Sequence, residues 1–348
     1  MTLPPIDETL LLRFLVDLLK TPSPTGFSEE AIVLTERVFR AIPGMKTART
    51  RKGALLVTLE GEQNNTPRAL AAHVDTLGLM VKAIKPSGRL ALTRIGGYVW
   101  NTIEGEGCTV FTRAGNRIRG SVLVNTASSH VYGEKTAKTE RGDETMEMRL
   151  DDKVASAAET RARGIEVGDF IAIDPRVELT NGFVRSRHLD DKAGVACLVE
   201  AVRALRAAGL KPKQTTHLYI SNFEEVGHGA STGLPDDVTE LVVVDMAAIG
   251  DGQNSDEFHA TLCVKDSSGP YHHGLGNHLR KLAEENDIPY KVDIYPYYGS
   301  DGSAFWRAGG NAAVALIGPG VDASHNYERT HTESLVATTN WALAYMLG

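Results

Sequence analysis

Metal-competent side chains follow several apolar runs of this sequence at the point where each run ends. They are His73 after residues 68–72, Glu224 and Glu225 after residues 215–222, and Asp245 after residues 241–244. In open α/β sheets, the carboxyl ends of the strands form the edge at which sites are built, so we expect these side chains to meet. Asp190 and Asp191 add two carboxylates at the start of a predicted helix, and His331 lies in the loop before the last predicted helix.

Each of these residues also has a structural interpretation. Asp190 or Asp191 could cap a helix, because aspartate is favoured at that position. The Glu224–Glu225 pair could lie on a solvated surface, Asp245 could belong to a turn, and single histidines are often structural. We favour a site because these coincidences all fall at one edge of the predicted sheet.

Two imidazoles and three carboxylates, one of them bridging, suit a pair of borderline divalent ions such as Zn²⁺ or Co²⁺, with Mn²⁺ as an alternative. Asp75 lies two residues after His73, where its carboxylate can accept the hydrogen of the second imidazole nitrogen. Of the two adjacent glutamates, one can bind metal while the other serves as general base. This set of groups predicts hydrolysis rather than redox chemistry.

The elements that must position these groups have an α/β rhythm. Helices are predicted at residues 7–20, 28–40, 193–208, 271–285 and 334–347, and strands at residues 54–59, 68–72, 215–222, 241–244, 290–294 and 313–317. Residues 78–181 contain short β-like runs separated by Gly, Asn and Pro, which is typical of a small β-rich module such as a barrel. We therefore predict a catalytic α/β domain formed by residues 1–77 and 182–348, with an inserted β-rich domain at residues 78–181.

Composition limits the classes of partner and compartment. The chain has 348 residues, a formal net charge of −7 and three cysteines. An acidic balance argues against a nucleic-acid-coating surface, and no run reaches the roughly 20 apolar residues of a membrane helix. Few, unpaired cysteines fit a reducing compartment, so we expect a cytoplasmic protein that binds neither nucleic acid nor membrane.

At these residues the sequence resembles the tetrahedral and glutamyl aminopeptidases of metallopeptidase family 42, over nearly the whole chain. The matching segments are residues 22–26, 72–75, 167–170 with 174–176, 189–194, 224–227, 244–245 and 329–331. The resemblance implies a mostly parallel sheet flanked by helices, of the di-zinc exopeptidase type, with an inserted barrel-like dimerisation domain. It also implies a homo-oligomer, from a dimer up to a dodecamer.

The same resemblance implies a role for each residue and an aminopeptidase acting on short peptides. His73 and Asp245 would each bind one metal ion, and Asp190 would bridge both ions. Glu225 and His331 would complete the two ligand sets. Glu224 would be the general base for a water activated by the two ions, and Asp75 would orient His73.

Some residues depart from the family pattern. Asp75 is followed by Thr76 instead of Glu, His331 is followed by Thr332 and Glu333 instead of Ser-Pro, and a second histidine stands at position 325. These features resemble an offshoot associated with the osmolyte N-acetylglutaminylglutamine amide. One alternative is therefore an amidohydrolase or deacylase acting on an N-acylated dipeptide or dipeptide amide. Another is a catalytically silent, self-assembling peptide-binding protein.

Overall fold

The sheet of the catalytic body has ten strands in the computed structural model, which describes residues 2–348. Along the sheet the strands are β1 (Lys46–Arg49), β2 (Leu55–Leu59), β12 (Gln214–Ser221), β3 (Gln63–His73), β13 (Glu240–Val244), β18 (Ala313–Val321), β15 (Ala260–Asp266) and β16 (Gly269–Pro270), with β14 (Ala247–Ala248) beside β18 and β17 (Tyr290–Ile294) beside β15. The central strands β12, β3, β13 and β18 are parallel, while β2 and β15 run antiparallel to their inner neighbours.

Both faces of the central strands are buried, as the absence of polar alternation in these runs predicts. Because successive side chains point to opposite faces, Leu70 and Val242 enter one apolar core while Ala69 and Leu241 enter another. The first core contains side chains of α1 (Glu8–Leu19), α2 (Glu29–Arg40), α6 (Leu189–Ala207), α7 (His273–Glu285) and α9 (Thr332–Leu347). On the second face, Ala230 of the 3₁₀ turn η3 (Gly229–Ser231) belongs to the core, and Phe305 of α8 (Asp301–Arg307) packs against it. A further 3₁₀ turn, η2 (Glu224–Val226), precedes η3 in the chain.

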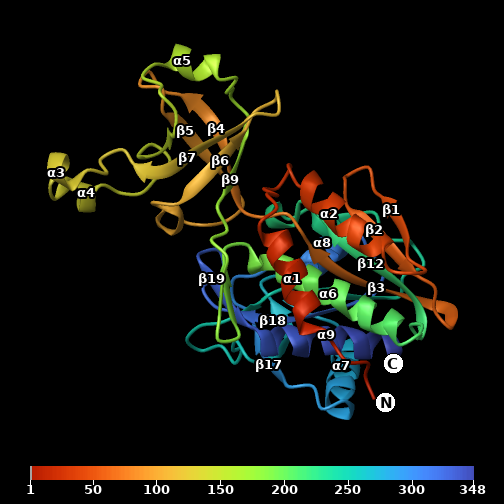
Figure 1. Ribbon diagram of the computed structural model, residues 1–348. Coiled ribbons are helices and arrows are strands. Elements are labelled where there is room, and N and C mark those ends of the chain that lie inside the picture. The colour runs from red at the N-terminus through yellow and green to blue at the C-terminus, as the bar shows by residue number, and fades with distance from the viewer. Residues whose placement is uncertain (1) are drawn as a thin grey trace.

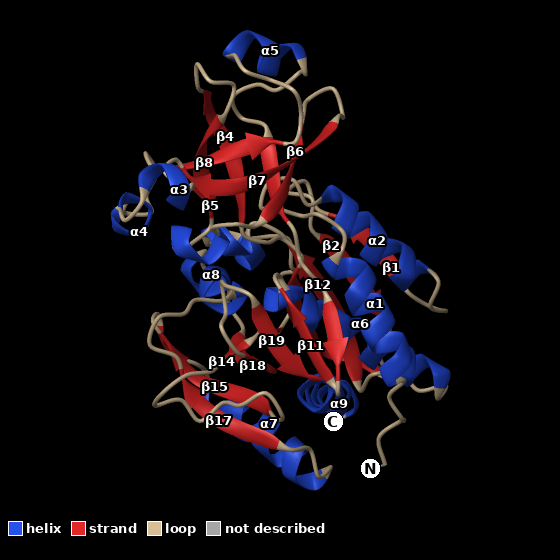
Figure 2. Ribbon diagram, turned by 60° about the vertical axis from the view of Figure 1, so that its left-hand side comes forward, coloured by secondary structure: helices blue, strands red, loops and turns tan. Residues whose placement is uncertain are grey.

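A closed six-stranded barrel stands apart from this body and appears above it in Figures 1 and 2. Its strands in order are β4 (Gly78–Ile84), β5 (Leu90–Ile95), β8 (Met146–Leu150), β7 (Arg117–Val124), β6 (Gly107–Phe111) and β9 (Phe170–Ile173). The segments that connect the barrel strands contain four short helices: η1 (Trp100–Ile103), α3 (Ser129–Tyr132), α4 (Lys135–Lys138) and α5 (Ala157–Ala162). The barrel has its own apolar core, which includes Leu79, Val110, Val122 and Met148.

A small sheet joins the chain leaving the barrel to the end of the catalytic body. It consists of β10 (Glu178–Thr180), β11 (Phe183–Ser186) and β19 (Glu328–His331). The barrel strands lie within the predicted insert, and the expected division at residue 181 falls in the turn between β10 and β11. The α/β body with an inserted barrel confirms the predicted fold class, although the large sheet is mixed.

The structure departs from the predicted elements by adding the strand β15 and the helix α8, and by lengthening β18. The last strand was predicted at residues 313–317, before Gly318, Pro319 and Gly320. The structure continues it to Val321, and Pro319 lies opposite Ala260 of β15. In the described part of the chain, the helices are all too short or too polar to cross a bilayer.

Candidate active site

His73 is the last residue of β3, and its imidazole is almost completely buried at the carboxyl edge of the sheet. Its Nδ1 donates to the backbone carbonyl of Asp75 at 2.9 Å. Its Nε2 lies 3.1 Å from Oδ1 of Asp190 and 3.7 Å from Oε2 of Glu224. The carbonyl therefore fixes the ring so that Nε2 faces the carboxylates.

His325 has the same arrangement on the other side of Asp190. It follows β18 by four residues, and its Nδ1 donates to the backbone carbonyl of Gly97 at 2.6 Å. Its Nε2 lies 3.2 Å from Oδ2 of Asp190 and 3.5 Å from Oε2 of Glu225. Gly97 belongs to the segment after β5, so the inserted region orients one of the two imidazoles.

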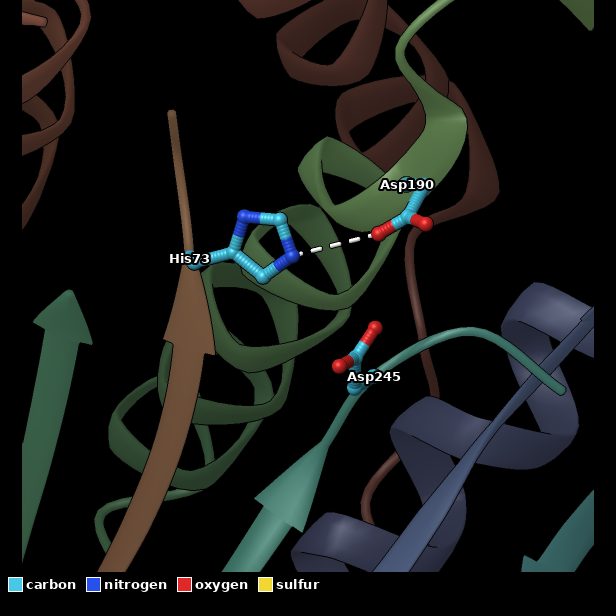
Figure 3. Close-up of side chains that lie close together, drawn as sticks. All are labelled: His73, Asp190 and Asp245. Atoms are coloured by element: carbon cyan, nitrogen blue, oxygen red, sulfur yellow. Dashed lines mark hydrogen bonds and ion pairs between the residues drawn. The ribbon is translucent and has the colours of Figure 1, made fainter. Parts of the chain in front are cut away.

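Asp190 is consequently shared by two groups of potential ligands. One group is His73, Asp190 and Asp245, and the other is Asp190, Glu225 and His325; within each group one donor atom per residue lies within 4.8 Å of the others. Figure 3 shows the first group, with His73 at the end of β3, Asp190 at the start of α6 and Asp245 just after β13. Four of the five predicted ligands thus meet at the edge where the sequence places them.

The fifth predicted ligand, His331, lies elsewhere, and this expectation needs correction. His331 is the last residue of β19, and its ring packs against Phe183 and Phe258 with centroid separations of 4.8 and 5.2 Å. Its Nδ1 accepts a hydrogen bond from the backbone N–H of Glu333 at the start of α9. The pairing of β19 with β11 holds the side chain in this aromatic cluster, outside both ligand groups.

Asp75 also acts differently from the expectation. Its backbone carbonyl, not its carboxylate, is the near partner of His73, since Oδ1 is 3.6 Å from Nδ1. The buried carboxylate instead accepts from Thr25 Oγ1 at 2.6 Å and from the backbone N–H groups of Glu224 and Glu225 at 3.1 and 3.4 Å. Asp75 thereby holds the turn that carries the two glutamates.

Two further buried carboxylates, which were not predicted from the sequence to support the site, accept hydrogen bonds from groups around it. Glu328 accepts from the backbone N–H of Asp190 at 3.2 Å and from that of His325 at 3.0 Å. Asp301 accepts from Ser221 Oγ at 2.5 Å and from the backbone N–H of Ala230 at 2.6 Å. Asp301 thus joins the residues on either side of the Glu224–Glu225 turn to the start of α8.

Crowding of acidic groups out of water gives the site a strong preference for positive charge. Burial and the neighbouring Asp190 charge raise the pKa of Asp245 to about 7 and that of Glu225 to about 8. Burial also raises the pKa of Glu224 well above its usual range, and nearby Asp245 adds to this. Burial opposes protonation of His325, but its contacts with Asp190 and Glu225 outweigh burial and raise its pKa to about 11.

Three residues at the site have a left-handed backbone that is uncommon outside glycine. They are His188 with φ 72°, Phe223 with φ 64° and His325 with φ 62°. His188 precedes the Asp190 segment, and Phe223 precedes Glu224 directly. Such conformations cost roughly 1–3 kcal/mol each and persist where surrounding structure enforces them. Here they turn the chain so that the side chains of the two candidate ligand groups face one another.

His325 is the candidate ligand that the sequence did not single out. With the strand ending at Val321, the first histidine after it is His325. Its four-residue distance from the strand end set it apart from His73 and Asp245, which lie at or directly after their strand ends.

Comparisons with known proteins first give the fold class. A TET aminopeptidase from a marine sediment archaeon of the Thaumarchaeota superposes with a TM-score of 0.87 at 19% identity, covering 97% of this chain and 96% of that one. A Pyrococcus horikoshii TET1 peptidase, described as able to assemble into a tetrahedron or a large octahedral shell, gives 0.83 at 21% identity, covering 97% and 99%. This chain therefore has the fold of TET aminopeptidase subunits.

Sequence similarity then gives the family. The chain belongs to the M42 glutamyl aminopeptidase family, whose model matches residues 53–340. It is 47% identical over 336 residues to the putative aminopeptidase YhfE of Bacillus subtilis, covering 96% of each chain. It is also 28% identical to the glutamyl aminopeptidase of Lactococcus lactis, covering 76% of each chain. The protein is accordingly an aminopeptidase, a hydrolase of peptide bonds.

Proposed function

We propose that this aminopeptidase removes N-terminal residues from short peptides with the help of two divalent metal ions per subunit. His73, Asp190 and Asp245 would hold one ion, and Asp190, Glu225 and His325 the other. Glu224 would act as the general base. In this assignment His325 replaces His331, and Asp75 supports the Glu224–Glu225 turn.

The observation that carries the proposal is the pair of imidazoles on either side of Asp190. Each donates its Nδ1 hydrogen to a backbone carbonyl and presents Nε2 to a different oxygen of Asp190. Metal-binding histidines are commonly oriented in this way, and a carboxylate whose two oxygens face two donor groups suits a bridging ligand. The raised pKa values of Asp245 and Glu225 support binding of dications at this site, because dications would offset the repulsion among buried carboxylates. Zn²⁺, Co²⁺ and Mn²⁺ all accept this donor set.

When bound, the two ions would supply Lewis acidity and lower the pKa of water towards neutrality. Glu224 is outside both ligand groups and lies 3.7 Å from His73, so its carboxylate is free to accept a proton. It would take that proton from the water whose oxygen bonds to the scissile carbonyl carbon. It would then deliver the proton to the leaving amine as the carbon–nitrogen bond breaks. Burial raises the pKa of Glu224 well above its usual range, so its carboxylate binds a proton more readily than an exposed glutamate does.

We also propose that the barrel mediates self-association into a dimer and, through further contacts, a larger shell. Support comes from the related TET1 peptidase and from α3, which carries Val131 with 72% and Tyr132 with 42% of their surfaces exposed. Light scattering coupled to size-exclusion chromatography measures the assembly directly. A monomeric mass at working concentrations would contradict this part of the proposal.

Glu224→Gln tests the proposed chemistry. We expect turnover of an aminoacyl p-nitroanilide to fall by roughly 10²–10⁴-fold, the usual contribution of a general base. Metal content by elemental analysis and the melting temperature should match those of the wild type. Glu60→Gln is the matched control, because 65% of that side chain is exposed and it pairs with Lys46.

Retained turnover in Glu224→Gln would remove this residue from the base function. Hydrolysis of the N-acetylated substrate in preference to the free amine would favour the amidohydrolase alternative. Absence of bound metal in protein prepared without chelator would favour the catalytically silent alternative.

A further inference from the structure

The candidate active site opens into a cavity of about 370 Å³. Four acidic residues line one part of it: Asp190, Glu224, Glu225 and Asp245. Among residues 2–348, Arg307 is the one arginine or lysine on its walls. Its guanidinium therefore offers a fixed positive charge to anything that enters the site from solvent.

Arg307 is not used by the protein itself. Within the described part of the chain, its guanidinium makes neither an ion pair nor a hydrogen bond, although acidic residues line the same cavity. One terminal nitrogen lies 4.0 Å from the position that a Cβ atom on Gly227 would take, so the group stands beside the turn that carries Glu224 and Glu225. Favourable interaction with the helix dipole accounts for a basic residue at the end of α8, but not for its place on the cavity wall.

The helix that carries Arg307 is anchored directly to the catalytic turn. Its first residue, Asp301, accepts from Ser221 and Ala230 on either side of Glu224–Glu225. Ser300 and Ser303 form a capping box at the same end of the helix. The backbone of Arg307 therefore has a defined position relative to the Glu224–Glu225 turn, and its exposed side chain reaches the cavity from there.

We propose that Arg307 binds a carboxylate of the peptide substrate and thereby determines specificity. This inference rests on the proposed aminopeptidase function and goes beyond it by naming the substrate group. A peptide carries carboxylates in two places, on an acidic side chain and at its C-terminus, and a guanidinium binds either with paired hydrogen bonds. The two dications of the proposed site would offset its carboxylate ligands, so a substrate anion would not be repelled.

Two matched pairs of substrates separate the two sources. The first pair is the p-nitroanilides of Glu and Gln, which differ only in the side-chain charge. The second pair is Leu-Gly and Leu-Gly amide, which differ only at the C-terminus. kcat/KM is measured for all four with the wild type, Arg307→Gln, Arg307→Lys and the control Arg113→Gln. Arg113 lies outside the cavity and 87% of its side chain is exposed.

We expect Arg307→Gln to lower kcat/KM by roughly 10- to 100-fold for the carboxylate-bearing member of one pair, which corresponds to one charge-assisted interaction. The neutral member of that pair should change less than about threefold, and the pair that responds identifies the source of the carboxylate. Arg307→Lys should restore part of the preference, and Arg113→Gln should leave it intact. Metal content should be equal in all variants.

Two results overturn the inference while leaving the proposed function in place. One is an unchanged preference within both pairs, and the other is an equal loss for all four substrates, which would show a structural role. A wild type that holds metal and cleaves none of the four refutes the proposed function, and the inference falls with it.

Discussion

Replacing each of the two histidines near the end of the chain by alanine tests the ligand assignment most directly. His325→Ala removes the Nε2 that lies 3.2 Å from Asp190 and 3.5 Å from Glu225. One of the two proposed metal positions then retains only carboxylates. Because loss of a residue that merely supports a ligand costs roughly 10–100-fold in metal affinity, we expect loss of a ligand to cost at least about 100-fold. Bound metal should fall from two ions to one per chain, and turnover should be lost.

His331→Ala is the matched control, because the structure gives that side chain a structural function. The substitution removes a helix-capping acceptor, worth about 1 kcal/mol, and aromatic contacts with Phe183 and Phe258, worth about 1 kcal/mol more. We expect the free energy of unfolding to decrease by about 2 kcal/mol. Metal content and kcat/KM should remain within about threefold of the wild type.

Both variants are assayed by elemental analysis after dialysis, by calorimetric titration with Zn²⁺, and by hydrolysis of an aminoacyl p-nitroanilide. If His331→Ala loses an ion while His325→Ala keeps both, the geometric reasoning is refuted and the ligand function returns to His331. Equal metal loss in both variants, with no change in melting temperature, would also contradict the assignment.

Three further predictions concern metal, pH and support of the site. Dialysis against EDTA should abolish turnover and lower the melting temperature, and Zn²⁺ at 100 times its Kd should restore about 2.7 kcal/mol of stability; an unchanged melting temperature would argue against bound ions. In the EDTA-treated protein, burial raises the pKa values of Glu225 and Glu328 from 4.5 to about 8. The folded chain then binds more protons than the unfolded chain between these pH values, so its free energy of unfolding should fall as pH rises through that window, as chemical denaturation at several pH values can measure. Glu328→Ala removes the acceptor for Asp190 and His325 and should weaken Zn²⁺ binding roughly 10–100-fold by calorimetry, whereas Glu328→Gln keeps one acceptor oxygen and should weaken it less.

The sheet edge was predictable because it depends on local patterns. Apolar runs such as residues 241–244 identify buried strands, and parallel strands end at a common edge. His73 and Asp245 follow from this rule without knowledge of the loops between them. The inserted barrel was predictable in outline for a similar reason, since residues 78–181 contain short β-like runs separated by Gly, Asn and Pro.

The choice between His325 and His331 could not be made from local pattern. Both residues lie near the end of a strand, but pairing of β19 with β11 places His331 among aromatic rings. The left-handed backbone at His325 instead turns that side chain towards Asp190. Strand pairing over more than a hundred residues decides this outcome, and a single sequence carries no local signal for it.

The sequence by itself determined which chemical groups the candidate site contains: carboxylates and imidazoles at the ends of buried strands, and an adjacent pair of glutamates. Tertiary structure alone decided which histidine joins the site and that a backbone carbonyl, rather than the Asp75 carboxylate, orients His73. It also decided that Arg307 reaches the same cavity. Residue type fixes which atoms can donate or accept, whereas the direction of each side chain depends on the packing of segments distant in sequence.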